Sequence, residues 1–308
     1  MYFGPIALIV LSLAPVVFLL WYFNRLDKKQ KESKRFLWSI FLWGILVTFV
    51  AGAVEYFLDL TFADLITDPL VYLTVSAFIF VATTEEGLKY WVVKKKAYDH
   101  PAFNEYYDGV IYAVVASLGF AALENIFYIL EGGIYVAIIR ALLAVPAHAL
   151  FGAIMGYNIG MARFEKDKHE SGKLLRKGLF LAIFFHGLYD FLLLTSSGLA
   201  LFVIPILLGM FLYIKRKIKH LHFLDGVEGA YLPKKWTIWT YIKVGIGMIF
   251  FTIGLLTIFS ISLYLVQDPL GQGLFTDIDF NVPSSSIFAA ITWLIAFGLM
   301  REKKHINN

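Results

Sequence analysis

The amino-acid sequence predicts an all-α membrane protein, a polytopic bundle of about nine transmembrane helices. Of its 308 residues, 59% are hydrophobic, and the mean hydropathy is +0.71. Soluble domains average about 45–50% apolar residues, so this composition is typical of a chain that lies in a bilayer. Two further observations support the prediction: apolar stretches of membrane-spanning length recur along the chain, and basic residues gather in alternate loops.

Each predicted span is an apolar stretch close to the length of about 20 residues that a transmembrane helix needs. Two of these stretches, 199–214 and 285–300, are shorter than the rest. The nine predicted spans are 2–23, 36–58, 69–93, 108–130, 133–162, 174–195, 199–214, 241–267 and 285–300.

Lysine and arginine predict the orientation, because these residues are retained on the cytoplasmic side of a membrane. Basic residues occur in every second loop, and the loops between these carry acidic residues and no basic ones. An N-out, C-in topology therefore fits every loop, and we expect the long connection 215–240 to be a cytoplasmic surface loop. Of the 27 basic residues, 25 lie in 24–35, 94–96, 163–177, 215–243 and 301–304.

The chain contains no internal repeat and no soluble linker, so 1–308 is expected to form a single integral membrane domain. Its predicted partner at this point is the lipid bilayer, and the lack of a basic soluble domain argues against nucleic acid. The absence of cysteine excludes disulfides, thiolate metal sites and cysteine nucleophiles.

Ionisable residues inside the spans are the candidates for chemistry, because a charged group at the centre of a bilayer costs roughly 2.5–3.5 kcal/mol. They concentrate on the third to sixth spans, so 69–195 is the predicted catalytic core and 199–308 an accessory region. The candidate catalytic residues are Glu85, Glu86, Glu124, His148 and His186, and the candidate supporting residues are Lys89, Asn125, Arg140 and Asp190.

Helical spacing predicts which way these groups point, since residues four apart share a helix face. Glu85 and Lys89 are stacked in this way, and so are His186 and Asp190. At about 1.5 Å per residue, Glu85, His148 and His186 fall in the cytoplasmic half of the bilayer. The same arithmetic puts Glu124 roughly 24 Å from Asp108, towards the outer leaflet and away from the others.

Structural roles are the alternative for individual residues. Glu85 with Lys89 could be an ion pair that only stabilises the fold, and Arg140 could extend to the interface or pair with a carboxylate. Glu55 and Asp59, at the outer end of the second span, are expected to be interfacial. Such roles explain less well why two adjacent glutamates, a third glutamate and two histidines converge from four consecutive spans.

Four motifs occur in order on four successive spans: TEEGLK (84–89), DGV (108–110) leading to GFAALEN (119–125), PAHALF (146–151) and HGLYD (186–190). Together they resemble the PrsW family of intramembrane proteases, which is distantly related to the CAAX prenyl endopeptidases and ABI proteins. In those distant relatives an arginine stands at the position of Lys89, and the final motif is often HxxxN, from which Asp190 departs.

The resemblance implies a multi-pass protease of a prokaryotic cell membrane that cleaves membrane-anchored proteins. One of Glu85 and Glu86 would be the general base that activates water, and His148 and His186 would hold the water or stabilise the oxyanion. No cofactor is required for this glutamic mechanism, although glutamate and histidine could also hold zinc. The rival hypotheses are a proton- or ion-coupled transporter and a protease-like factor without catalysis.

Overall fold

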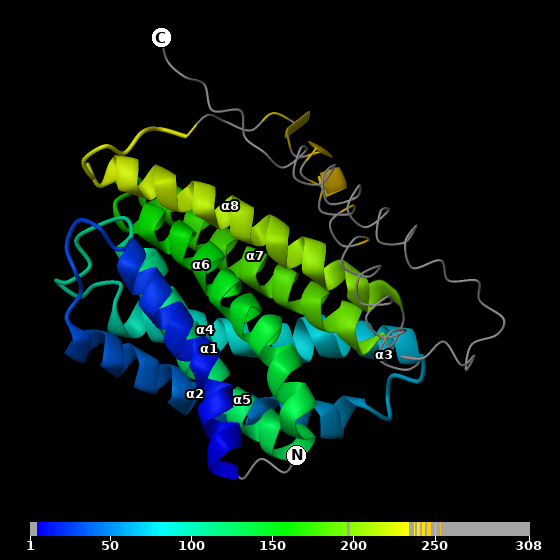
Figure 1. Ribbon diagram of the computed structural model, residues 1–308. Coiled ribbons are helices and arrows are strands. Elements are labelled where there is room, and N and C mark those ends of the chain that lie inside the picture. The colour runs from blue at the N-terminus through cyan, green and yellow to red at the C-terminus, as the bar shows by residue number, and fades with distance from the viewer. Residues whose placement is uncertain are drawn as a thin grey trace, which may run out of the picture. The chain divides into compact units, whose positions relative to one another are not determined.

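The computed structural model describes residues 5–195 and 198–233, together with isolated residues between 237 and 253. Over this part of the chain it contains helices and turns and no strand, which confirms the all-α class (Figure 1). The helices are α1 (Pro5–Leu26), α2 (Lys34–Phe62), α3 (Pro69–Val75), η1 (Ser76–Ala82), α4 (Thr83–Lys96), α5 (Asp108–Leu142), α6 (Ala144–Arg163), α7 (Lys168–Leu194), η2 (Gly198–Phe202) and α8 (Val203–Leu224).

Five of the described helical stretches are long and apolar enough to cross a membrane, and a shorter apolar helix covers Ser12–Leu26. The predicted spans 241–267 and 285–300 lie outside the described residues, so the count of nine spans and the N-out, C-in topology stay predictions. The five stretches are Lys34–Phe62, Pro69–Lys96, Asp108–Arg163, Lys168–Leu194 and Leu199–Leu224.

The chain divides into two compact units. The first contains residues 1–203 and 210–233, and the second contains 204–209 with 234–308. The features described below all belong to the first unit. The predictions of one domain over 1–308, a core at 69–195 and an accessory region at 199–308 stay predictions.

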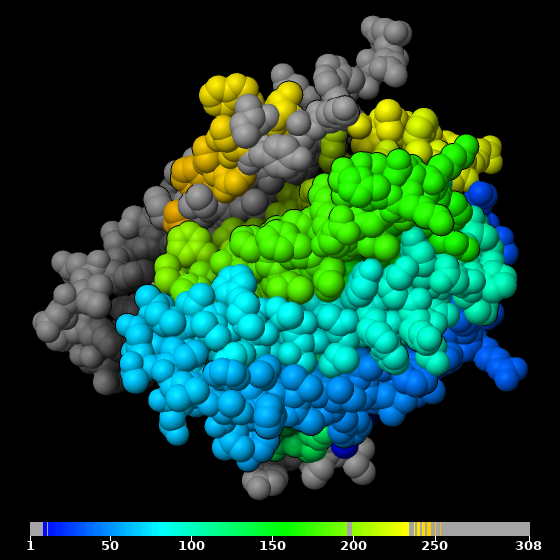
Figure 2. Space-filling model, turned by 180° about the vertical axis from the view of Figure 1, so that it is seen from behind, coloured from blue at the N-terminus to red at the C-terminus, as the bar shows by residue number. Residues whose placement is uncertain are grey.

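Helix α5 is the centre of the first unit, where α1, α2 and α6 pack against it. Nearly every residue from Asp108 to Ala122 is buried. On the face seen in Figure 2, α2, the third span and α7 lie side by side as blue, cyan and green bands, in agreement with their mutual contacts. The third span therefore lies between α2 and α7.

Small residues bring α5 and α6 together in antiparallel orientation. Gly109 lies against Gly156 and Gly160, and Gly152 lies against Ser117 further along α5. Such residues allow the close approach of helix backbones that membrane proteins use in place of a hydrophobic driving force between helices. We call this contact of small residues between α5 and α6 the glycine seam. It fixes the register of the two helices, and therefore which polar side chains of α5 lie level with which polar side chains of α6.

A Gly109→Ala variant is expected to lower the free energy of unfolding by about 1–3 kcal/mol. The new Cβ would lie against the Gly156 carbonyl oxygen and the Gly160 backbone nitrogen, which can move only if the helices separate. Gly52→Ala is the matched control, because a Cβ at Gly52 meets no atom within 4 Å. Unfolding in mixed detergent micelles measures both, and equal stability of the two variants would contradict the prediction.

Two expectations about helix boundaries are wrong. The span predicted at 133–162 is not one continuous helix, because Leu143 separates α5 from α6, whereas the positive φ of 67° at Gly133 falls at the start of that span. The segment 215–240 is not entirely a loop, because α8 continues to Leu224. Ile218 and Leu221 are buried on this basic extension, and burial of that apolar face stabilises it as helix.

Candidate active site

The third span changes its winding just before the glutamates. Residues Ser76–Ala82 form the π-helix η1, and the regular helix α4 begins at Thr83. The Thr83 hydroxyl donates a hydrogen bond of 2.8 Å to the Phe78 carbonyl, five residues earlier in the chain. Phe78 also packs against Gly187 of α7, where a larger residue would clash with the ring. Such π-turns are frequent at functional sites.

Lys89 joins the two glutamates. Its Nζ donates hydrogen bonds of 2.8 Å to Glu85 Oε2 and 2.8 Å to Glu86 Oε1. All three side chains are buried, and Lys89 is only 1% exposed. The expected stacking of Glu85 with Lys89 is confirmed, and Glu86 reaches the same ammonium from three residues away. One positive charge therefore lies between two carboxylates.

His148 extends this network to α6. Its Nδ1 lies 3.1 Å from Lys89 Nζ and accepts a hydrogen bond, because an ammonium can only donate. The proton of a neutral ring is then on Nε2, which lies 2.8 Å from Glu124 Oε2. Lys89 Nζ also lies 4.1 Å from the centre of the Phe120 ring, in a cation–π contact.

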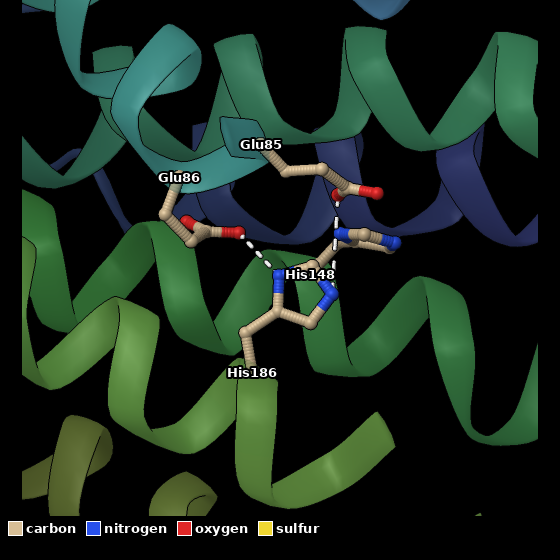
Figure 3. A group of neighbouring side chains, drawn as sticks. All are labelled: Glu85, Glu86, His148 and His186. Atoms are coloured by element: carbon tan, nitrogen blue, oxygen red, sulfur yellow. Dashed lines mark hydrogen bonds and ion pairs between the residues drawn. The ribbon is translucent and has the colours of Figure 1, made fainter. Parts of the chain in front are cut away.

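His186 reaches the glutamates from α7 (Figure 3). Its Nδ1 lies 2.9 Å from Glu86 Oε1, and its Nε2 lies 3.9 Å from Glu85 Oε2. Asp190, one turn further along α7, places Oδ2 3.3 Å from the same Nε2. The Phe151 ring stacks on the imidazole at 4.9 Å between ring centres. The ring is thus held by two glutamates, an aspartate and an aromatic face.

Glu124 lies within this group, and the expectation that it would lie apart is wrong. The depth estimate treated 133–162 as one helix that starts at its outer end. Measured from their adjoining ends at Asp108 and Arg163, Glu124 and His148 lie about 24 Å and about 22 Å along antiparallel helices, so they are level. The location of this group in the cytoplasmic half of the bilayer stays a prediction.

Arg140 and Asn125 support Glu124 from its other side. Arg140 Nη2 lies 3.1 Å from Glu124 Oε1, and Arg140 Nε donates a hydrogen bond of 2.6 Å to Asn125 Oδ1. The Asn125 amide in turn donates to the Ser12 carbonyl of α1 at 3.1 Å. Arg140 therefore pairs with a carboxylate, one of the two structural roles expected for it.

Sequence reasoning missed Glu55, which was assigned to the interface. Its Oε1 is buried without a hydrogen-bond partner in the described part of the chain, and its charge interacts with those of Glu85, Glu124 and Lys89. No motif includes Glu55. Its position in the last third of α2, which packs against the third span, relates it to the site, and the sequence alone does not show that these helices are neighbours.

The four central side chains could hold a metal ion. One ligand atom from each of Glu85, Glu86, His148 and His186 lies within 4.8 Å of the others, and all four residues are buried. Two carboxylates and two imidazoles form a donor set typical of zinc. Glu86 Oε2 is buried and has no hydrogen-bond partner among the described residues, so it is available to a metal or to water.

Comparison with known proteins gives a consistent result. A family model described as PrsW family intramembrane metalloprotease matches residues 32–214. No solved structure matches the chain significantly.

Several curated bacterial proteins named Protease PrsW are similar to this chain. The protein from Geobacillus kaustophilus is 38% identical over 213 residues, which are 69% of this chain and 91% of the relative. The protein from Halalkalibacterium halodurans is 37% identical over 221 residues, or 71% of this chain and 99% of the relative. The one from Bacillus subtilis is 34% identical over 213 residues, or 69% and 94%. Since the family model covers more than half of the chain and these relatives are matched over nearly their whole length, the chain belongs to the PrsW family of intramembrane proteases.

Proposed function

We propose that this protein hydrolyses peptide bonds of membrane-anchored protein substrates in a bacterial cell membrane, with a water molecule activated by glutamate. One observation carries the proposal: Glu85 and Glu86 lie within a few ångströms of two histidines from other helices, and one oxygen of Glu86 is free to accept a proton. A general base needs such a free lone pair within hydrogen-bond reach of the water.

The surrounding residues have distinct roles in this proposal. Glu86 removes a proton from the attacking water through Oε2 and returns it to the leaving nitrogen when the C–N bond breaks. The Nδ1 of His186 is engaged by Glu86, so its Nε2, which faces Glu85 and Asp190, is the nitrogen that donates to the oxygen that becomes negatively charged as water adds to the carbonyl. Lys89 positions Glu86, Glu124 positions His148, and Asp190 positions His186, each through a direct contact. Glu85 shares the ammonium with Glu86 and can accept a second proton.

A zinc ion would be held by the same four residues, Glu85, Glu86, His148 and His186. When bound, zinc supplies a Lewis acid and lowers the pKa of a water molecule to about 7. Lys89 donates to the same carboxylate oxygens, so its ammonium and a divalent ion would compete for them.

The proposal is tested with the purified chain in liposomes and a single-span reporter protein. We expect two fragments, and in water enriched in ¹⁸O the new carboxyl terminus should carry the label. A Glu85→Gln/Glu86→Gln double variant serves as the negative control. An intact reporter with the wild-type chain, across several anchored substrates, would contradict hydrolysis.

The rival functions give other outcomes in the same liposomes. A coupled transporter would show proton uptake that depends on a solute and would leave the reporter intact. A binding factor without catalysis would retain the reporter, and the double variant would behave as the wild type. The family assignment favours neither of these alternatives.

An Asp190→Asn variant is expected to lower kcat by roughly 10–100-fold. The carboxylate faces His186 Nε2 at 3.3 Å and fixes the orientation of the ring, whereas an amide can present a donor to the same nitrogen. We expect KM and the unfolding midpoint to stay close to wild type, which separates positioning from a structural defect. Asp64→Asn, at an exposed position, is the matched control, and equal kcat for the two variants would refute the assignment.

A further inference from the structure

The C-terminal ends of α1 and α8 lie on the same side of the first unit (Figure 1). A groove lies between these ends of the two helices. Its volume is about 170 Å³. A cavity of that order holds a benzene-sized group, so this one can take a short length of a hydrocarbon chain. Its apolar lining consists of Tyr22, Phe23, Leu26, Phe211, Ile214 and Ile218.

Basic side chains complete the lining of this groove. Lys28 follows α1, while Lys215 and Lys219 are four residues apart and so share one face of α8. Lys28 and Lys215 are exposed, and Lys219 donates a hydrogen bond of 3.1 Å to the Tyr231 hydroxyl. An apolar groove with three lysine side chains fits a ligand that is a hydrocarbon at one end and anionic at the other.

The end of the groove is fixed by hydrogen bonds. His222 Nε2 donates to the Leu26 carbonyl at 2.8 Å, which ties α8 to the last turn of α1. The Tyr107 hydroxyl donates to the Phe23 carbonyl at 2.8 Å, which ties α1 to the start of α5. Because both helices are held at this end, the groove is a preformed feature of the fold.

Three carboxyl groups near the groove, those of Asp27, Glu105 and Asp225, could repel an anionic ligand, but burial makes each of them harder to ionise. Asp27 and Asp225 are buried, and burial raises the pKa of each above its usual range. Burial, together with the charges of Asp225 and Asp27, raises the pKa of Glu105 to about 7. Asp225 also accepts hydrogen bonds from the backbone nitrogens of Tyr106 and Tyr107. The three lysines line the groove, whereas none of these carboxylates does, so an incoming headgroup meets the lysines directly.

We propose that the groove between α1 and α8 binds an anionic phospholipid, with part of one acyl chain against Phe23, Ile214 and Ile218 and the phosphate on Lys28, Lys215 and Lys219. Both helices are apolar and contain or border predicted membrane spans, so lipid is the molecule always present at this surface. The basic ends of these helices are also predicted to be cytoplasmic, where anionic lipids attract lysine and arginine. This site is separate from Glu85 and Glu86.

The test compares lipids bound to the purified full chain in mixed micelles. Dioleoyl phosphatidylglycerol and dioleoyl phosphatidylcholine are titrated separately, and binding is read by native mass spectrometry and by the shift of the unfolding midpoint. We expect phosphatidylglycerol to bind more tightly, and inorganic phosphate alone to produce no shift. Equal binding of the two lipids, or a full shift with inorganic phosphate, would overturn the proposal.

Variants locate the site. Each lysine near an anionic headgroup contributes about a fivefold change in affinity, so a Lys28→Gln/Lys215→Gln/Lys219→Gln variant should bind phosphatidylglycerol on the order of 100-fold more weakly at low salt. The matched control, Lys34→Gln/Lys166→Gln/Lys168→Gln, removes the same charge elsewhere and should retain wild-type affinity. Equal losses in both variants would contradict a specific site.

A third variant tests the hydrocarbon part and does not depend on the lysines. Leu26→Trp places a larger ring in the groove and leaves the Leu26 carbonyl available to His222. It should weaken both lipids while the preference for phosphatidylglycerol remains. Unchanged affinity would show that no acyl chain occupies the groove, and that outcome would refute the proposal as stated. None of these readouts requires proteolysis, so failure here and failure of the proposed function are distinguishable.

Discussion

A Glu86→Gln variant is expected to cleave a membrane-anchored reporter about 10²–10⁴-fold more slowly than the wild type. The substitution keeps the shape of the side chain and removes the group that would take a proton from water. Glu86 Oε1 is already occupied by Lys89 and His186, so Oε2 is the oxygen available for this task. The measurement is kcat in liposomes at equal protein level.

The Glu86→Gln result needs two controls. Glu131→Gln makes the same chemical change at an exposed position and should cleave as the wild type does. Bound zinc, measured on the same samples, distinguishes loss of a base from loss of a ligand, because Glu86 belongs to the group that could hold a metal. Cleavage by Glu86→Gln within tenfold of wild type would remove this residue from the proposed mechanism.

A Lys89→Met variant is expected to lower the free energy of unfolding by about 3–5 kcal/mol. The buried ammonium is the positive partner of Glu85 and Glu86 at 2.8 Å each, and its loss leaves two adjacent carboxylates facing each other without compensation. His148 also loses the donor to Nδ1 and can rotate away from its present position. Unfolding titrations in mixed micelles measure the effect.

Two companion variants make the Lys89 prediction specific. Lys95→Met, at an exposed position near the end of α4, should change stability little. Lys89→Arg keeps the charge but brings a larger, planar group, so it should retain more stability than Lys89→Met. A loss below about 1 kcal/mol for Lys89→Met would mean that the buried pair is compensated in some other way.

Much of the fold could be predicted because the bilayer imposes a simple rule. A span must be helical and about 20 residues long, so helices such as α2 and α7 are visible from the long, mostly apolar segments within them. The break at Leu143 lies just before Pro146, which has no N–H to donate to the Leu142 carbonyl and which is tolerated in the first turn of a helix. The apolar pattern alone does not show this break, but Pro146 was a signal for it in the sequence.

The candidate site was predictable where the signal was local. Glu85 and Lys89 share a helix face by spacing alone, and so do His186 and Asp190, and both pairs are in contact. Glu55 was not predictable, because its relation to the site depends on α2 lying against the third span. Glu124 was misplaced for a similar reason, since its level follows from the glycine seam between α5 and α6.

The π-helical segment η1 changes the direction in which the later side chains of the third span point. A regular helix advances about 100° per residue, so an extra residue in one turn rotates everything after it by that angle. Residues before Ser76 can keep one orientation towards lipid while Glu85 and Glu86 take another towards His186. A chain shortened by a single residue within η1 would keep every motif in order and yet turn its glutamates away from the histidines. The number of residues in segment 76–82 is therefore as important for the site as the motif that follows it.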